Sequence, residues 1–228
     1  DPLWSRGLGD VYKRQILPIN LFKSKTYSAS MLGLLLANIG IMGPMVILPL
    51  FFQSFKHYSA IEAALALIPQ GVGMLITRPY IGKYIDRIGA KYVIMISIVI
   101  AIIGTLPLAF VDQHTSIWWI SLILFIRGCS VGGINLGLMA DAYKGVSESQ
   151  LSEAGVGINM IENVGASFGT AIIATVVASN ISKSAMHDVI SKQLTGFHEG
   201  FVVSVIAILF VLIPALFLTK NKQGIDES

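Results

Sequence analysis

The sequence has 228 residues, of which 54% are apolar and only 13% charged, and its mean hydropathy is +0.73. Soluble domains have about 25% charged residues, so this composition excludes an ordinary soluble protein and is typical of a multi-pass membrane protein. A net charge of +3 from dispersed cations excludes a nucleic-acid-binding surface. The four histidines and the single cysteine show no metal-ligand spacing, and no cofactor is predicted.

The first fifteen residues, DPLWSRGLGDVYKRQ, are out of character with the apolar sequence that follows them. Their last six residues resemble translated sequencing-adapter read-through. We interpret residues 1–15 as a non-native segment; a genuine cytoplasmic linker is the alternative. We expect residues 16–220 to form the transmembrane part of the chain and residues 221–228 to form a cytoplasmic tail.

Six apolar runs are each long enough to cross a membrane core, which takes about 20 helical residues. The expected spans are 28–53, 59–81, 92–110, 116–141, 153–178 and 200–219. The predicted fold class is therefore an all-α transmembrane bundle. The third and sixth spans carry no charge and contain one proline each, Pro107 and Pro214, whereas the unusual residues lie in the other four. This pattern favours two three-helix repeats, each with a peripheral third helix.

Basic residues between the spans and near their ends are distributed unequally between the two sides of the membrane. One side has nine, if residues 1–15 and Arg127 are left out: Lys23, Lys25, Arg78, Lys83, Arg87, Lys91, Lys144, Lys220 and Lys222. The other side has three: Lys56, Lys183 and Lys192. Because cytoplasmic loops are enriched in Lys and Arg, both ends of this segment are predicted to be cytoplasmic.

The fifth span has a narrow face of small and polar residues with a carboxylate at its centre. This face comprises Gly155, Asn159, Glu162, Ala166 and Gly169, which fall on one side of a helix. The opposite face is apolar and comprises Val156, Met160, Val164, Phe168 and Ile172. We predict that the polar face lines a pathway and that the apolar face contacts lipid.

Two charges are predicted near the middle of the membrane, Arg127 in the fourth span and Glu162 in the fifth. At 1.5 Å per residue, each lies about 15 Å from the end of its span. We expect the two to face each other. Either Glu162 exchanges a proton or attracts a cationic substrate while Arg127 changes partners, or the two form a static pair that orients two helices.

Four stretches resemble motifs of the major facilitator superfamily. GKYIDRIGAK, residues 82–91, is similar to the family's loop motif at Gly82, Asp86, Arg87, Gly89 and Lys91, although Tyr84 replaces the usual Leu. FIRGCSVGG, residues 125–133, is similar to its Arg-Gly motif. Residues 58–79 and 154–171 resemble helices of its fourteen-helix drug:proton antiporter branch, but Glu162 stands where that branch usually has Arg.

The resemblance implies a six-helix half of a transporter, the C-terminal one, whose missing N-terminal half would supply the opposite wall of a cavity. It implies a multi-pass protein of the bacterial inner or plasma membrane whose partners are a small-molecule substrate, protons and the lipid bilayer. Glu162, Arg127 and Asn159 are the candidate pathway residues, and the residues of the loop motif are candidates for cytoplasmic gating. We expect proton-coupled efflux of drugs or other amphipathic or cationic compounds.

Three alternatives remain open. The chain could belong to a major facilitator carrier for another small solute, such as a metabolite or a peptide, or to a membrane scaffold or sensor that transports nothing. A membrane-embedded enzyme is not expected, because the spans contain no paired carboxylates, no Ser/His set and no cluster of metal ligands.

Overall fold

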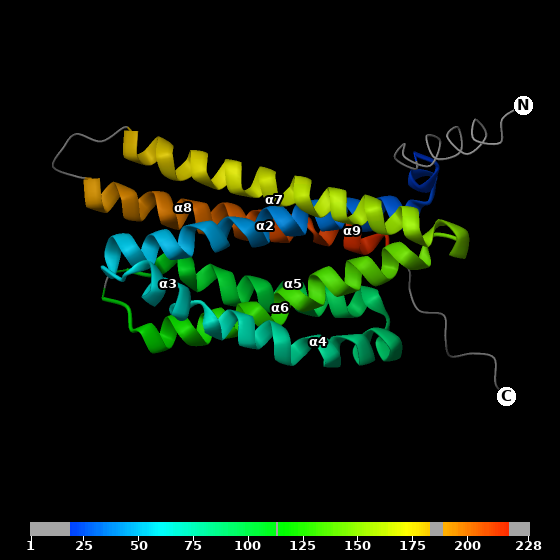
Figure 1. The fold of residues 1–228 in the computed structure, drawn as a ribbon, viewed down its shortest axis with the longest axis horizontal. Coiled ribbons are helices and arrows are strands. Elements are labelled where there is room, and N and C mark those ends of the chain that lie inside the picture. The colour runs from blue at the N-terminus through cyan, green and yellow to red at the C-terminus, as the bar shows by residue number, and fades with distance from the viewer. Residues whose placement is uncertain (1–18, 113, 183–188, 219–228) are drawn as a thin grey trace, which may run out of the picture.

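The computed structural model describes residues 19–112, 114–182 and 189–218, which form a bundle of long helices without strands (Figure 1). The segments predicted to be non-native and to form a cytoplasmic tail, residues 1–15 and 221–228, lie outside these ranges. Lys183, Lys220 and Lys222, which entered the prediction of topology, also lie outside them.

The long helices are α2 (Lys25–Phe55), α4 (Ile68–Ile88), α5 (Ala90–Thr105), α6 (Ile117–Lys144), α7 (Leu151–Ser182) and α8 (Val189–Phe210). The shorter elements are η1 (Ile19–Lys23), α3 (Ala60–Ala66), η2 (Leu106–Phe110), η3 (Glu148–Gln150) and α9 (Leu212–Leu216). Among the described residues, six helical stretches are long and apolar enough to cross a membrane: Lys25–Phe55, Ala60–Ile88, Ala90–Phe110, Ile117–Lys144, Glu148–Ser179 and Leu194–Leu216. The all-α transmembrane fold class is thus confirmed.

The segment expected to form a loop after residue 81 is helical instead. Helix α4 continues to Ile88, and α5 begins at Ala90. The single residue between them, Gly89, has φ 89° and ψ 152°, a backbone conformation open almost only to glycine. Because this one residue makes the whole turn, seven residues that were expected in a loop extend the second span.

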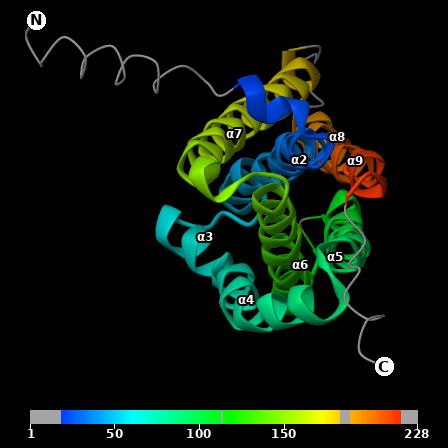
Figure 2. The same ribbon diagram turned by 90° about the vertical axis from the view of Figure 1, so that its right-hand side faces the viewer.

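Helices α2 and α6 pack against each other at the centre, and each carries two further helices. Helix α2 packs on α7 and α8, whereas α6 packs on α4 and α5 (Figure 2). These groups are not the predicted repeats, since the first span packs on the fifth and sixth and the fourth packs on the second and third. The expectation of a peripheral third helix in each repeat is wrong for the described residues, because the second and fifth spans are the least buried. Helix α5 and helices α8 and α9 lie on one side of the bundle, and α4 and α7 lie on the other.

Glycines allow the closest of these helix contacts. At Gly128 of α6, an added Cβ would collide with the backbone carbonyl of Gln70 in α4. At Gly165 and Gly169 of α7, it would lie 2.7 and 2.6 Å from the carbonyl oxygens of Leu35 and Ile39 in α2. Small residues are used in this way at helix interfaces in membranes, because lipid supplies no hydrophobic drive for helix association.

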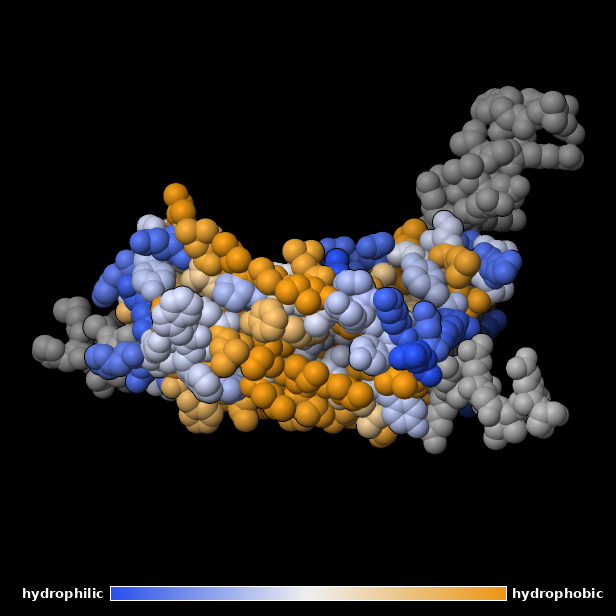
Figure 3. All heavy atoms as spheres, turned by 90° about the horizontal axis from the view of Figure 1, so that it is seen from below, coloured by the Kyte–Doolittle hydropathy of each residue, from blue (hydrophilic) through white to orange (hydrophobic). Residues whose placement is uncertain are grey.

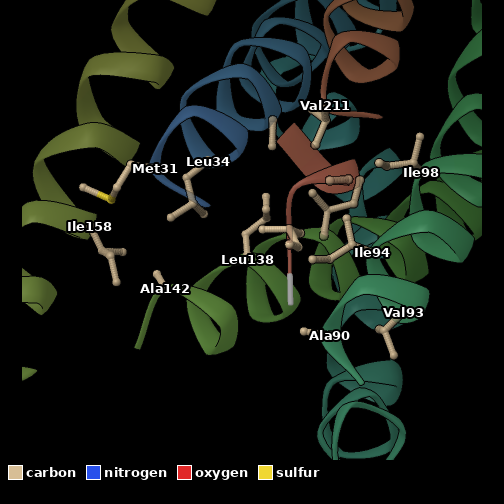
Figure 4. Close-up of a cluster of buried hydrophobic side chains, with 14 of the residues drawn as sticks. Met31, Leu34, Ala90, Val93, Ile94, Ile98, Leu138, Ala142, Ile158 and Val211 are labelled. Atoms are coloured by element: carbon tan, nitrogen blue, oxygen red, sulfur yellow. The ribbon is translucent and has the colours of Figure 1, made fainter. Parts of the chain in front are cut away.

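The interior contains two apolar clusters, one toward each end of the bundle. The first includes Leu34, Ile94, Leu138 and Ile158 from four helices (Figure 4). The second contains an aromatic group in which Phe51 and Phe55 stack on each other and both contact Phe197 edge to face. On the face seen in Figure 3, an apolar band covers the middle of the molecule and hydrophilic residues gather toward its two ends, as a membrane-spanning protein requires.

Helices α4 and α7 are the least covered of the six spans. Only 11% of the most apolar window of the α3–α4 span and 17% of that of the η3–α7 span is buried, against 50% or more in the other four. The exposed surfaces of α4 and α7 border one face of the bundle. The candidate site described below lies on that face.

Candidate substrate cavity

A cavity of about 380 Å³ lies between α4 and α7, and α2 and α6 complete its lining. It is lined by residues of all four helices: Asn38, Met42, Arg78, Gly132, Asn135, Leu136, Met139, Asn159, Glu162, Asn163 and Ala166. Four asparagines and two opposite charges make up six of the eleven lining residues, so the cavity is more polar than a typical small-molecule site, which is mostly apolar.

On the α7 wall, the asparagine side chains are oriented by their own helix. Asn159 donates from Nδ2 to the carbonyl of Gly155 over 3.0 Å, and Asn163 donates to the carbonyl of Asn159 over 2.7 Å. Because a carbonyl only accepts hydrogen bonds, these contacts assign the nitrogen end of each amide. Each amide oxygen therefore remains available to a bound molecule.

Glu162 lies between these two asparagines in the sequence and is half-buried. Among the described residues it has no hydrogen bond and no ion pair, although it lines the cavity. The structure thus brings together two of the predicted pathway residues, Glu162 and Asn159, on one wall.

On the facing wall, α4 contributes Arg78, a residue that sequence reasoning missed. The sequence places Arg78 at the cytoplasmic surface, because it predicts that the second span ends at residue 81. Since α4 continues to Ile88, Arg78 lies ten residues before its end and lines the cavity. A helical pattern that continues without a break through residues 82–88 is the sequence signal that could have placed Arg78 inside the second span.

The predicted pairing of Arg127 with Glu162 is wrong. Arg127 is 1% exposed and does not line the cavity. Its Nη1 donates to Oε1 of Gln70 over 2.9 Å, and its Nη2 donates to the backbone carbonyl of Ile41 over 2.8 Å. The physical reason is that α6 packs on α4 and α2, whereas it barely touches α7, so the buried side of α6 that carries Arg127 faces away from α7.

Proline assists this arrangement. Pro44 of α2 supplies no N–H, so the carbonyl of Gly40, four residues earlier, lacks its helical donor and the hydrogen bonds of this turn are weakened. The carbonyl of Ile41, the next residue along, accepts the hydrogen bond from Arg127 in this weakened turn. Its Nε has no partner among the described residues.

The apolar face of α7 is uncovered. Its five residues Val156, Met160, Val164, Phe168 and Ile172 are each between 39% and 58% exposed. Gly165 and Gly169 instead pack on α2. The polar face predicted for this helix is therefore split, because Glu162, Asn159 and Ala166 line the cavity while Gly169 serves helix packing.

The candidate gating residues lie at the far end of α4 and do not line the cavity. Asp86 and Arg87 are exposed on the last turns of α4, after Gly82. Gly89 makes the turn into α5, and Lys91 donates from Nζ to the carbonyl of Leu216 in α9 over 2.6 Å. The motif therefore joins α4, α5 and α9 at one end of the bundle.

Comparisons with known proteins agree with this architecture. Residues 3–170 match the family model of the Major Facilitator Superfamily. The chain is 24% identical over 94% of its length to an uncharacterized MFS-type transporter of Bacillus subtilis, and 23% identical over 92% to a lincomycin resistance protein of Listeria innocua. It is 23% identical over 74% to a multidrug resistance protein B homolog of Mycobacterium tuberculosis.

The matched stretches make up 46%, 46% and 32% of the lengths of those three relatives, so the chain spans about half of the proteins it resembles, or less. The family model covers most of the chain, and the all-helical bundle of six candidate spans has the form of one half of such a transporter. On this evidence, the chain belongs to the Major Facilitator Superfamily.

Proposed function

We propose that this chain forms one six-helix half of a membrane transporter that exports amphipathic, positively charged compounds in exchange for protons. Members of this family move small molecules by alternating access, in which two halves of the protein rock around a site near the middle of the membrane. The relatives named for lincomycin resistance and multidrug resistance support efflux of foreign compounds. The proposed location is the bacterial inner membrane, with the end of the bundle that carries Lys23, Arg87 and Lys144 in the cytoplasm.

One observation carries the proposal: Glu162 is the single carboxylate that lines the cavity within the described residues. A carboxylate without a partner near the middle of a membrane costs about 2.5–3.5 kcal/mol. Binding a proton or binding a cationic substrate would relieve this cost, and the two would compete for the same oxygens. Competition of this kind couples entry of protons to export of the substrate.

The remaining predicted residues have supporting roles in this proposal. Asn159 offers its amide oxygen beside Glu162. Arg127 acts from behind as a positioning residue, because it holds α4 and α2 in place around the cavity. Gly82, Asp86, Arg87, Gly89 and Lys91 would control opening at the cytoplasmic end, where they connect the ends of three helices.

The experiment uses the protein produced from its complete reading frame and reconstituted in proteoliposomes with an imposed pH gradient. Export of a fluorescent cation is measured for the wild type and for Glu162→Gln. The substitution removes the charge and the titration but keeps the shape, so proton-driven export is expected to vanish. Glu153→Gln is the matched control, because Glu153 lies on the same helix outside the cavity lining.

Export by Glu162→Gln at the wild-type rate would contradict proton coupling through this residue.

A carrier for another small solute, such as a metabolite or a peptide, is the second candidate function, since the name of the B. subtilis relative states no substrate. Exchange of preloaded solutes in the same proteoliposomes separates the two candidates. Flux of any solute would exclude a scaffold or sensor.

A further inference from the structure

We propose that this cavity binds molecules that carry both a positive and a negative group, with Glu162 as partner of the cation and Arg78 as partner of the anion. The proposal rests on the proposed function, because it takes the cavity as the substrate site. It narrows the substrate class from positively charged compounds to zwitterionic or dipolar ones.

The first argument is the placement of the two charges. Arg78 comes from α4 and Glu162 from α7, and both line one cavity. Helix α4 packs mainly on α6, whereas α7 packs mainly on α2, so the two helices form separate walls. In the described part of the chain, neither side chain has a hydrogen bond or an ion pair, and both are therefore open to a ligand.

The second argument is how Arg78 reaches the cavity. Its side chain passes over Gly132 of α6, where an added Cβ would lie 3.6 Å from Arg78 Cγ. Gly132 lines the cavity as well. The glycine thus leaves a shallow surface along which the aliphatic stem of Arg78 extends. A guanidinium binds carboxylates and phosphates through two parallel hydrogen bonds, so an anionic group is its natural ligand.

The third argument is charge balance. A simple cation on Glu162 would leave the Arg78 charge unpaired in a site of low dielectric constant, and Arg78 would repel it. A molecule with both groups pairs each charge. Where the positive group is an ammonium, the amide oxygens of Asn159 and Asn163 would also accept hydrogen bonds from it.

The test compares two dyes that differ by one charge. Rhodamine B carries a carboxylate beside its delocalised cation, and rhodamine B ethyl ester is the same cation without the carboxylate. Binding is measured by fluorescence anisotropy to the protein from its complete reading frame in phosphatidylcholine nanodiscs, with empty nanodiscs as the baseline. We expect wild type to bind rhodamine B roughly tenfold more tightly than the ester, the usual value of a charged hydrogen bond.

Four variants test which residues cause the preference for rhodamine B over its ester. Arg78→Gln should reduce the ratio of the two affinities to about one, and Arg78→Lys should retain part of it, because lysine keeps the charge without the two-pronged geometry. Glu162→Gln should weaken both dyes in parallel. Lys83→Gln removes a charge from an exposed position of α4 outside the cavity lining and should keep the wild-type ratio.

Equal affinities in the wild type, or binding of neither dye, would overturn the proposal. So would a parallel gain for both dyes in Arg78→Gln, since that would mean that Arg78 pairs with Glu162 rather than with the ligand. The measurement is made at equilibrium without a pH gradient, so it stays separate from proton coupling. A dye preference without proton-driven export would disprove the antiport and support the recognition proposed here.

Discussion

Arg127 and Gln70 are joined by a buried hydrogen bond of 2.9 Å between Nη1 and Oε1, which links α6 to α4. The same guanidinium reaches α2 through the carbonyl of Ile41. One side chain thus connects both three-helix groups behind the cavity. Because a buried charge is costly unless its donors are used, we propose that Arg127 is a positioning residue, and we expect its loss to alter the geometry of the cavity.

The first prediction concerns stability. Arg127→Ala should lower the free energy of unfolding by about 3 kcal/mol, because it leaves the Gln70 amide oxygen without its Arg127 donor in a buried site and removes the hydrogen bond to the Ile41 carbonyl. Thermal unfolding of the purified protein in detergent measures this loss. An unchanged unfolding temperature together with lost transport would contradict the positioning role and place Arg127 in the pathway itself.

Gln70→Glu is the matched variant for this prediction. It replaces the neutral acceptor of Arg127 with a carboxylate of the same shape, so the hydrogen bond becomes an ion pair. The unfolding temperature should stay the same or rise. A marked fall would show that this interface does not accept an acid beside Arg127.

The second prediction concerns the contact between α4 and α6. Gly128→Ala should destabilise the protein, because its Cβ would collide with the Gln70 carbonyl and push the helices apart. The displacement would also break the Arg127–Gln70 hydrogen bond. Gly71→Ala is the control on α4, since nothing lies within 4 Å of an added Cβ there. Equal unfolding temperatures for the two variants would argue against the close approach.

The third prediction concerns the turn between α4 and α5. Gly89→Ala should cost about 1–3 kcal/mol, because φ 89° with ψ 152° is strained for any side chain. Gly89→Asn should not restore the lost stability, because asparagine tolerates the left-handed helical region of φ and ψ but not the conformation found at residue 89. Gly82→Ala is the comparison for stability: Gly82 is helical and has no atom within 4 Å of an added Cβ. The unfolding temperatures of the three variants test this prediction, and we expect Gly82→Ala to have the highest.

The fourth prediction tests which face of α7 meets water. In a Cys129→Ser background, Asn159→Cys should react with a charged, water-soluble thiol reagent in membranes, because Asn159 lines the cavity. Val156→Cys should remain unmodified, because Val156 is 57% exposed on the apolar face that we assign to lipid. Rapid labelling at both positions would mean that the two faces do not differ in access to water.

The apolar runs alone predict six spans and an all-helical fold, because each helix must be apolar over its own length to cross a bilayer. The polar face of α7 likewise predicts Glu162 and Asn159 as cavity residues. Both signals are local and repeat with the period of a helix. The end of the second span was misplaced, because Lys83, Asp86 and Arg87 resemble a loop and only the turn at Gly89 shows where α4 ends.

The sequence by itself determined that Arg127 and Glu162 lie within membrane-spanning helices, since depth follows from counting residues along a helix. Only the tertiary structure decided their partners. Rotation and packing of helices depend on where small residues permit close contact, and Gly128 brings α6 against α4 while Gly165 and Gly169 bring α7 against α2. These contacts assign Gln70 and Ile41 to Arg127, and place Arg78 and Glu162 in the same cavity.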